Sequence, residues 1–162
     1  MNTNLLKKIA LPLLGGMAVG YFANRSKNSG QETREQYEDF KQPPLSPPGA
    51  VFPIVWTGLY TMMGVAHYIV SERAEGKEKE EAERTYYTQL GLNFAWTPLF
   101  FKYEQRGLAL VDAGALAYTA SKTAKQFGAI DQRAGWLMAP YAAWTMFACY
   151  LNAGTWYLND VQ

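Results

Sequence analysis

Apolar residues gather in five stretches that polar and charged segments separate. Two of them, 49–70 and 134–158, contain no Asp, Glu, Lys or Arg, and three shorter ones cover 9–23, 86–101 and 107–127. At 1.5 Å per residue, each of the two uncharged stretches is long enough to cross a hydrocarbon layer of about 30 Å. None of the five alternates strictly between apolar and polar residues, so we predict helices and no strands.

The polarity of the helix faces indicates whether water or lipid surrounds these helices. A helix on the surface of a soluble bundle keeps a polar stripe, and 49–70 and 134–158 have none. The first stretch resembles a signal peptide, but "GYFANRS" is a poor cleavage site, so we expect it to be retained. We therefore predict an all-α membrane protein, a five-transmembrane-helix bundle in one domain over 1–162. Its helices are expected at about 5–24, 48–70, 85–102, 106–126 and 133–158, with the loop 25–47 over a pocket.

Composition narrows the chemistry. A net charge of +1 gives no field for nucleic acid, so no nucleic-acid partner is expected. The one cysteine, Cys149, and the one histidine, His67, exclude an intrachain disulfide and argue against a metal site. The mean hydropathy of −0.21 averages apolar segments with charged connectors such as 71–84. Nine Lys and Arg on the side of the N-terminus against six on the other side weakly favour a cytoplasmic N-terminus.

Aromatic and amide residues recur at helical spacing in three of the stretches. Three sets each share one helix face: Pro53, Trp56, Tyr60, Met63 and His67; Asn93, Trp96 and Phe100; Tyr141, Trp144, Ala148, Leu151 and Asn152. Buried amides need partners, so these faces should point inward. They either line a pocket for a flat, mostly apolar ligand or pack helix against helix.

Other positions have a structural and a functional interpretation. We expect Asp112 to reach water or Arg106, and His67 to be a satisfied residue near the end of its span, rather than either being functional. Gly91 and Ala95, four residues apart, allow close helix approach and could form a dimer interface. The prolines of "QPPLSPPG" predict an extended lead-in, and "SGQETREQYEDF" could form a short helix over the pocket mouth.

Four blocks in order, "PPGAVFPIVWTGLYTMMG", "QLGLNFAWTPLFF", "GLALVD" and "PYAAWTMFACYLN", resemble the signature of the TspO/translocator protein family (TspO/MBR), also called peripheral benzodiazepine receptors or tryptophan-rich sensory proteins. The resemblance runs from about Tyr37 to Asn152. It implies a five-helix bundle, usually dimeric, in the mitochondrial outer membrane of eukaryotes or in bacterial membranes. It also implies a pocket for porphyrins, sterols and synthetic ligands. The family's pocket lining maps onto Val51, Phe52, Trp56, Asn93, Trp96, Leu108, Ala148 and Leu151.

Departures from the family pattern bear on the chemistry. Gln36, Leu45 and Ala50 stand where relatives typically have tryptophan, and so do Phe94 and Leu108 in many of them. Indoles are plausible partners in porphyrin photochemistry, so their absence puts porphyrin degradation in doubt. The cholesterol-recognition pattern at the end of the last helix is missing, because Ala153 holds its aromatic position.

Three functions remain open at this point. The favoured one is an integral membrane protein that binds porphyrin, another tetrapyrrole, a sterol or a similar molecule and transports it or regulates its use. The alternatives are a light-dependent porphyrin-degrading enzyme and a regulatory membrane interaction partner. We expect no required cofactor. A porphyrin- or haem-like molecule is expected as a ligand instead. The expected ligand-binding residues are Val51, Phe52, Trp56, Tyr60, Asn93, Trp96, Phe100, Leu108, Trp144, Ala148 and Leu151, and the expected partners are the lipid membrane and a second copy of the chain.

Overall fold

The computed structural model describes residues 3–25 and 33–162 and contains no strand in these ranges. Its α-helices are α1 (Thr3–Arg25), α2 (Thr33–Asp39), α3 (Val51–Arg73), α4 (Gly76–Thr97), α5 (Arg106–Ile130) and α6 (Gln132–Trp156). Two short π-helical segments, η1 (Pro98–Lys102) and η2 (Tyr157–Val161), continue α4 and α6. The all-α prediction is confirmed. The count of five helices is wrong, because the polar segment before α3 forms the additional short helix α2.

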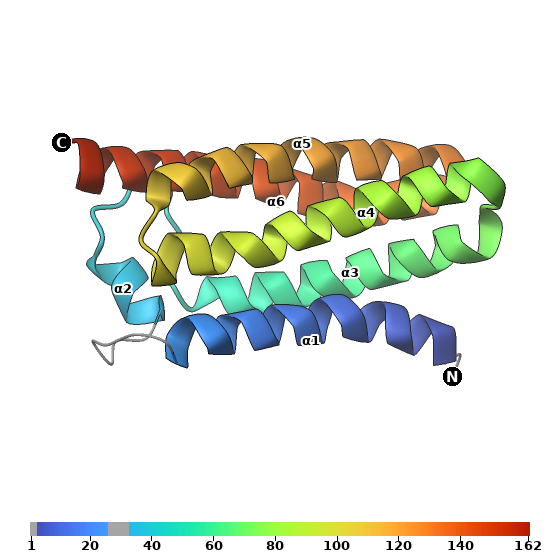
Figure 1. Ribbon diagram of the computed structural model, residues 1–162, viewed down its shortest axis with the longest axis horizontal. Coiled ribbons are helices and arrows are strands. Elements are labelled where there is room, and N and C mark those ends of the chain that lie inside the picture. The colour runs from blue at the N-terminus through green and yellow to red at the C-terminus, as the bar shows by residue number, and fades with distance from the viewer. Residues whose placement is uncertain (1–2, 26–32) are drawn as a thin grey trace.

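The five long helices form a closed ring in the order α1, α3, α6, α5, α4, with α4 returning to α1. Figure 1 shows the N-terminus, the α3–α4 junction and the α5–α6 junction together at one end, the junction end. At the other end lie α2, the α4–α5 connection and the C-terminus, and this is the cover end. The connections at the junction end are very short, whereas a longer segment that includes α2 joins α1 to α3 at the cover end.

Large apolar side chains cover much of the outer surface. By length and composition, Thr3–Ala23 of α1 is the one helix among the described residues that passes a hydropathy test for a membrane span. The other long helices carry exposed apolar side chains as well, among them Ile54, Val111, Tyr118, Trp136 and Met146. Such a surface is unfavourable in water and is matched by hydrocarbon.

Helix α4 begins at Gly76, well before the expected start at residue 85. The added segment is charged and contains Lys, Glu, Ala and Arg, which all have high helix propensity. The hydropathy pattern reports where a segment enters hydrocarbon, and a helix can continue beyond that point into water. The same reasoning explains why α3 continues past Val70 to Arg73.

His67 is completely buried at the junction end, although the sequence places it near water. Its Nε2 lies 2.9 Å from the Lys8 Nζ of α1 and 3.2 Å from the Glu83 Oε1 of α4. The His67 ring also packs on Tyr86, with 4.2 Å between the ring centroids. The Lys8–His67–Glu83 cluster therefore links α1, α3 and α4. The expectation of a satisfied histidine holds for Nε2 only, because His67 Nδ1 is buried with no hydrogen-bond partner among the described residues.

Asp131 holds the junction between α5 and α6. Its carboxylate accepts a hydrogen bond from the backbone N–H of Arg133 at 2.8 Å, which caps α6, and it contacts the Arg73 guanidinium at 2.7 Å. Hydrogen bonds from the Arg133 guanidinium lower the pKa of Asp131, helped by the cap and by the charge of Arg73, whereas burial opposes the shift. The negative charge of Asp131 is therefore stabilised by folding.

We predict that Asp131→Asn lowers the thermal midpoint at neutral pH. Because the folded pKa is lowered, the charged form contributes stability above the ordinary carboxyl pKa and loses it as the pH falls through the folded value. The difference in midpoint between the wild-type protein and Asp131→Asn should therefore shrink in acid. Thermal unfolding in detergent from pH 7 to pH 3 measures this, and an unchanged difference would contradict it.

Candidate functional site

Aromatic side chains of α3 and α6 meet inside the bundle. The Trp56 ring lies 5.3 Å from that of Tyr60 and 6.2 Å from that of Tyr141, measured between centroids. Closer to the cover end, Phe52 meets Trp144 edge-on at 5.9 Å. The side chains share inward faces because they recur at helical spacing.

A chain of hydrogen bonds crosses the bundle between these rings. The Tyr60 hydroxyl donates to Asn93 Oδ1 at 2.6 Å, and Asn93 Nδ2 donates to the Tyr141 hydroxyl at 3.3 Å. The Tyr141 hydroxyl in turn donates to Gln89 Oε1. Sequence reasoning missed Gln89, although it stands four residues before Asn93 and thus on the same face of α4. The chain joins α3, α4 and α6 through polar groups that hydrocarbon cannot solvate.

Trp96 and Asn152 form a second polar connection nearer the cover end. The Trp96 indole N–H donates to Asn152 Oδ1 at 2.8 Å, and Asn152 Nδ2 donates to the backbone carbonyl of Arg106 at 3.0 Å. The Trp96 ring stacks on Phe100, with 4.9 Å between centroids. Asn152 therefore fixes the orientation of the indole relative to the start of α5.

The short helix α2 and the segment after it lie over this end and contact the interior rings. Tyr37 meets Phe52 edge-on at 4.9 Å, and Phe40 meets Phe100 at 5.9 Å. This placement agrees with the expected short helix over the pocket mouth, although part of the sequence quoted for it lies outside the described residues.

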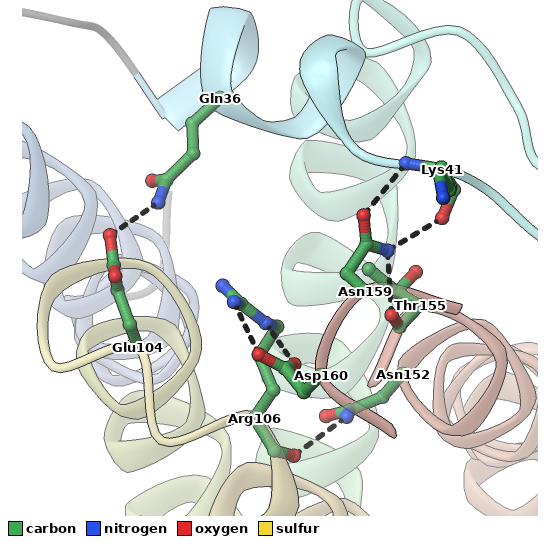
Figure 2. A network of polar contacts seen from close by, with 8 residues as sticks. All are labelled: Gln36, Lys41, Glu104, Arg106, Asn152, Thr155, Asn159 and Asp160. Carbon is green, nitrogen blue, oxygen red and sulfur yellow. Dashed lines mark hydrogen bonds and ion pairs between the residues drawn. The ribbon is translucent and has the colours of Figure 1, made fainter. Parts of the chain in front are cut away.

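Polar contacts tie the cover to the connection before α5 and to the C-terminal segment (Figure 2). Gln36 Nε2 donates to Glu104 Oε1 at 3.2 Å. Asn159 Nδ2 donates to the Lys41 carbonyl at 2.8 Å, and the Lys41 N–H donates to Asn159 Oδ1 at 3.0 Å. The Tyr150 hydroxyl also donates to the Pro44 carbonyl at 2.9 Å, and the Arg106 guanidinium lies 4.8 Å from the centroid of the Phe40 ring.

Arg106 forms a bidentate ion pair with Asp160 of η2, with N–O distances of 2.6 and 2.7 Å. Of the two partners expected for Asp112, water or Arg106, the second is wrong, because Arg106 pairs with Asp160 through Nε and Nη2. Asp112 Oδ2 is buried, with no hydrogen-bond partner in the described part of the chain. Sequence reasoning missed Asp160. It lies beyond the last apolar stretch, 134–158, and nothing in the sequence pattern indicated a partner for it.

Seven of the expected ligand-binding residues are connected to one another or to the cover by ring contacts or hydrogen bonds: Phe52, Trp56, Tyr60, Asn93, Trp96, Phe100 and Trp144. Leu151 is buried, and Val51 and Ala148 are half-buried. Leu108 does not join them, because its side chain is 54% exposed on α5. Gly91 and Ala95, the expected dimer interface, are exposed on α4.

These features define a class of protein: a helical membrane bundle whose interior carries aromatic and amide side chains beneath a short helical cover. Comparison with known sequences narrows the class. The model of the TspO/MBR family matches residues 8–158. The chain belongs to the TspO/MBR family.

Curated relatives come from distant organisms. A protein of Bos taurus called translocator protein is 36% identical over 154 residues, which cover 94% of this chain and 88% of the bovine protein. A translocator protein homolog of Schizosaccharomyces pombe is also 36% identical, over 88% of this chain and 87% of its own length. A tryptophan-rich protein TspO of Archaeoglobus fulgidus is 33% identical, over 96% and 99%. Family membership supports a ligand-binding, transport or regulatory role in a membrane.

Proposed function

We propose that this chain is a membrane ligand-binding protein for a flat, mostly apolar molecule such as a tetrapyrrole or a sterol, with a role in its transport or regulation. One observation carries the proposal: inward faces of α3, α4 and α6 bring aromatic rings and amides together under the cover. Aromatic faces supply stacking area, and a few fixed polar groups supply orientation. Asn93 and the Trp96–Asn152 pair are those polar groups. Binding requires no covalent step.

The rings contact one another, so a ligand must separate them. Tyr37 on Phe52 and Phe40 on Phe100 are the ring contacts between the cover and these interior residues. Binding loops are drawn from the segments of a protein that open at low free-energy cost, and the cover is a short helix with connecting segments on both sides. We propose that the ligand enters at the cover end as α2 and Phe40 move away from Phe52 and Phe100.

Two tryptophan substitutions on α6 test the proposal. Ala148 is half-buried on the proposed site, whereas Ala143 is exposed on the same helix. Ala148→Trp should fill the space that a ligand needs and weaken protoporphyrin binding by about tenfold or more, a change of about 1.4 kcal/mol. Ala143→Trp should leave the affinity unchanged.

Binding is measured by quenching of intrinsic fluorescence and by the Soret band in detergent, with thermal unfolding as the check that both variants are folded. Repeating the titration with a sterol separates the two ligand classes. Equal affinities of folded Ala148→Trp and Ala143→Trp for every ligand that binds the wild type would contradict the proposed site, and so would the absence of binding to the wild type.

We further propose that the Gly91–Ala95 face of α4 forms a homodimer. A Cβ added at Gly91 would meet no atom within 4 Å in the described protomer, so Gly91→Leu should leave the protomer folded. In a dimer the leucine would separate two closely packed backbones and shift the equilibrium to monomer.

Gly58→Leu is the matched control, because Gly58 is an exposed glycine of α3 with equally open surroundings. Light scattering in detergent measures the mass of both variants. A dimer that survives Gly91→Leu, or that dissociates equally in Gly58→Leu, excludes this interface.

A further inference from the structure

A groove between α4 and α5 lies toward the junction end, away from the proposed ligand site. Its volume is about 220 Å³, and its walls include Arg84 and Glu81 of α4 and Tyr118, Lys122 and Gln126 of α5. A second hollow of about 370 Å³ shares Glu81 and Gln126 with it and continues along the same two helices. The lining side chains are mostly polar or charged, so the groove is suited to a polar group.

Two cationic side chains face this groove from different helices. Arg84 belongs to α4 and Lys122 to α5, and neither side chain forms an ion pair with a residue that the structure describes. A guanidinium and an ammonium on two walls of one groove match the oxygens of a phosphate, which a guanidinium can bind through two parallel hydrogen bonds. The cationic part of the groove thus matches the charge and the hydrogen-bonding groups of a phosphate ester.

Hydrogen-bond acceptors lie in the same groove. Gln126 Oε1 is buried and has no hydrogen-bond partner among the described residues. Glu81 lines both hollows with Gln126, and its carboxylate makes no ion pair within the described ranges. A buried acceptor without a partner is costly, so a ligand that donates N–H groups would be favoured here. A primary ammonium fits an amide oxygen beside a carboxylate.

The charge pattern along α4 indicates the depth of the groove in the membrane. Glu81 and Arg84 belong to the charged segment 71–84, and the apolar stretch 86–101 follows almost at once. Trp136, near the start of α6, is 70% exposed, and exposed Trp is typical of the level of the lipid headgroups. The charged wall of the groove therefore lies beside the apolar stretch, where the headgroup of a phospholipid would lie.

We propose that this groove binds the headgroup of an aminophospholipid. The phosphate lies between Arg84 and Lys122, and the primary ammonium donates to Gln126 Oε1 and lies beside the Glu81 carboxylate. A choline headgroup has no N–H to donate, and a glycerol headgroup has no positive charge for Glu81. Phosphatidylethanolamine should accordingly bind more tightly than phosphatidylcholine or phosphatidylglycerol.

Native mass spectrometry of the full chain in detergent, titrated with each of the three lipids, tests this site. For the wild type we expect phosphatidylethanolamine to bind at least about threefold more tightly than the other two. Arg84→Gln with Lys122→Gln should weaken all three lipids, because the phosphate contacts are lost. Gln126→Met should remove only the preference for phosphatidylethanolamine. Lys125→Gln, which changes an exposed lysine of α5 that does not line the groove, should change neither result.

Several outcomes would overturn the assignment. Equal binding of the three lipids by the wild type, or a preference that persists in Gln126→Met, would exclude the ammonium site. Displacement of the lipid by water-soluble glycerophosphoethanolamine at equal concentration would assign the groove to a free phosphoester. A shift from dimer to monomer in the Arg84→Gln, Lys122→Gln variant, with lipid binding unchanged, would make the groove a contact between copies of the chain.

Discussion

Gly135→Ala is expected to destabilise the bundle by about 2–3 kcal/mol, although it adds a single methyl group. The added Cβ would lie 2.6 Å from the Gly128 Cα, 3.1 Å from the Gly128 N and 3.3 Å from the Ala124 carbonyl oxygen. All three are backbone atoms, so no side-chain rotation can relieve the overlap, and α5 and α6 must move apart. Forced backbone shifts in a packed interior cost about 1–3 kcal/mol and occasionally more.

Gly114→Ala is the control for this prediction. Gly114 lies in the middle of α5, and a Cβ there would meet nothing within 4 Å. The same substitution should therefore be neutral or stabilising, since alanine has a higher helix propensity than glycine by about 1 kcal/mol. Thermal unfolding, followed by a dye that reacts with the half-buried Cys149 thiol, compares the two variants. Equal thermal midpoints of Gly135→Ala and Gly114→Ala would contradict the prediction, because α5 and α6 could then move apart without loss of stability.

Asn93→Leu is expected to lower the free energy of unfolding by about 1–3 kcal/mol, the cost of leaving a buried polar group without a partner. The Tyr60 hydroxyl donates to Asn93, and the Tyr141 hydroxyl accepts from it. Leucine replaces neither contact. Tyr141 retains its hydrogen bond to Gln89, so Tyr60 suffers the greater loss.

A double-mutant cycle separates this effect from a change in packing. Tyr60→Phe removes the hydroxyl that Asn93→Leu leaves unpaired, so the double variant should be more stable than the sum of the two single losses indicates. Denaturant unfolding in one detergent measures all four proteins. If the two losses in the free energy of unfolding simply add, the hydrogen bond between Tyr60 and Asn93 makes no contribution to stability, and the prediction is wrong.

Several inward positions could be predicted from the sequence because polar and aromatic residues are conspicuous in apolar stretches. Trp56, Tyr60 and Met63 stand on one face at helical spacing, and the structure places all three inside or half inside the bundle. In a membrane, leucine is equally favourable on the lipid-facing side and on the inward side of a helix. The aromatic and amide residues therefore indicate which side of the helix faces inward. The short helix α2 was predictable for a different reason, namely the helix-forming charges of its polar segment.

Leu108 shows that a ligand-lining position of the family does not always have the same environment in this chain. The buried residues of α5 include Ala109, Ala113, Leu116 and Ala120, which follow helical spacing and place position 108 on the outer side. Because small alanines form the buried face, apolarity alone did not distinguish it from the exposed one. Here the spacing of the small residues was the better signal.

The Lys8–His67–Glu83 cluster could not be predicted, because it depends on contacts between helices that are distant in the sequence. Lys8 and Glu83 each flank an apolar stretch in the sequence, and in the structure each side chain is about one-quarter exposed beside a buried imidazole. Spacing within one helix gives no information about which residue of another helix it meets. The pairing depends on the order of the helices around the ring.

The two ends of the bundle differ in how they are closed, and this difference gives the molecule a direction. At the junction end, a glycine pair in backbone contact and the capped Asp131 turn hold α5 and α6 together, and the Lys8–His67–Glu83 cluster holds α1 to α3 and α4. At the cover end, Tyr37 of α2 packs on Phe52, Phe40 packs on Phe100, and side-chain hydrogen bonds join the cover to the α4–α5 connection and to η2. If the ligand enters at this end, as proposed above, the interior of the protein is in exchange with the compartment that the cover end faces.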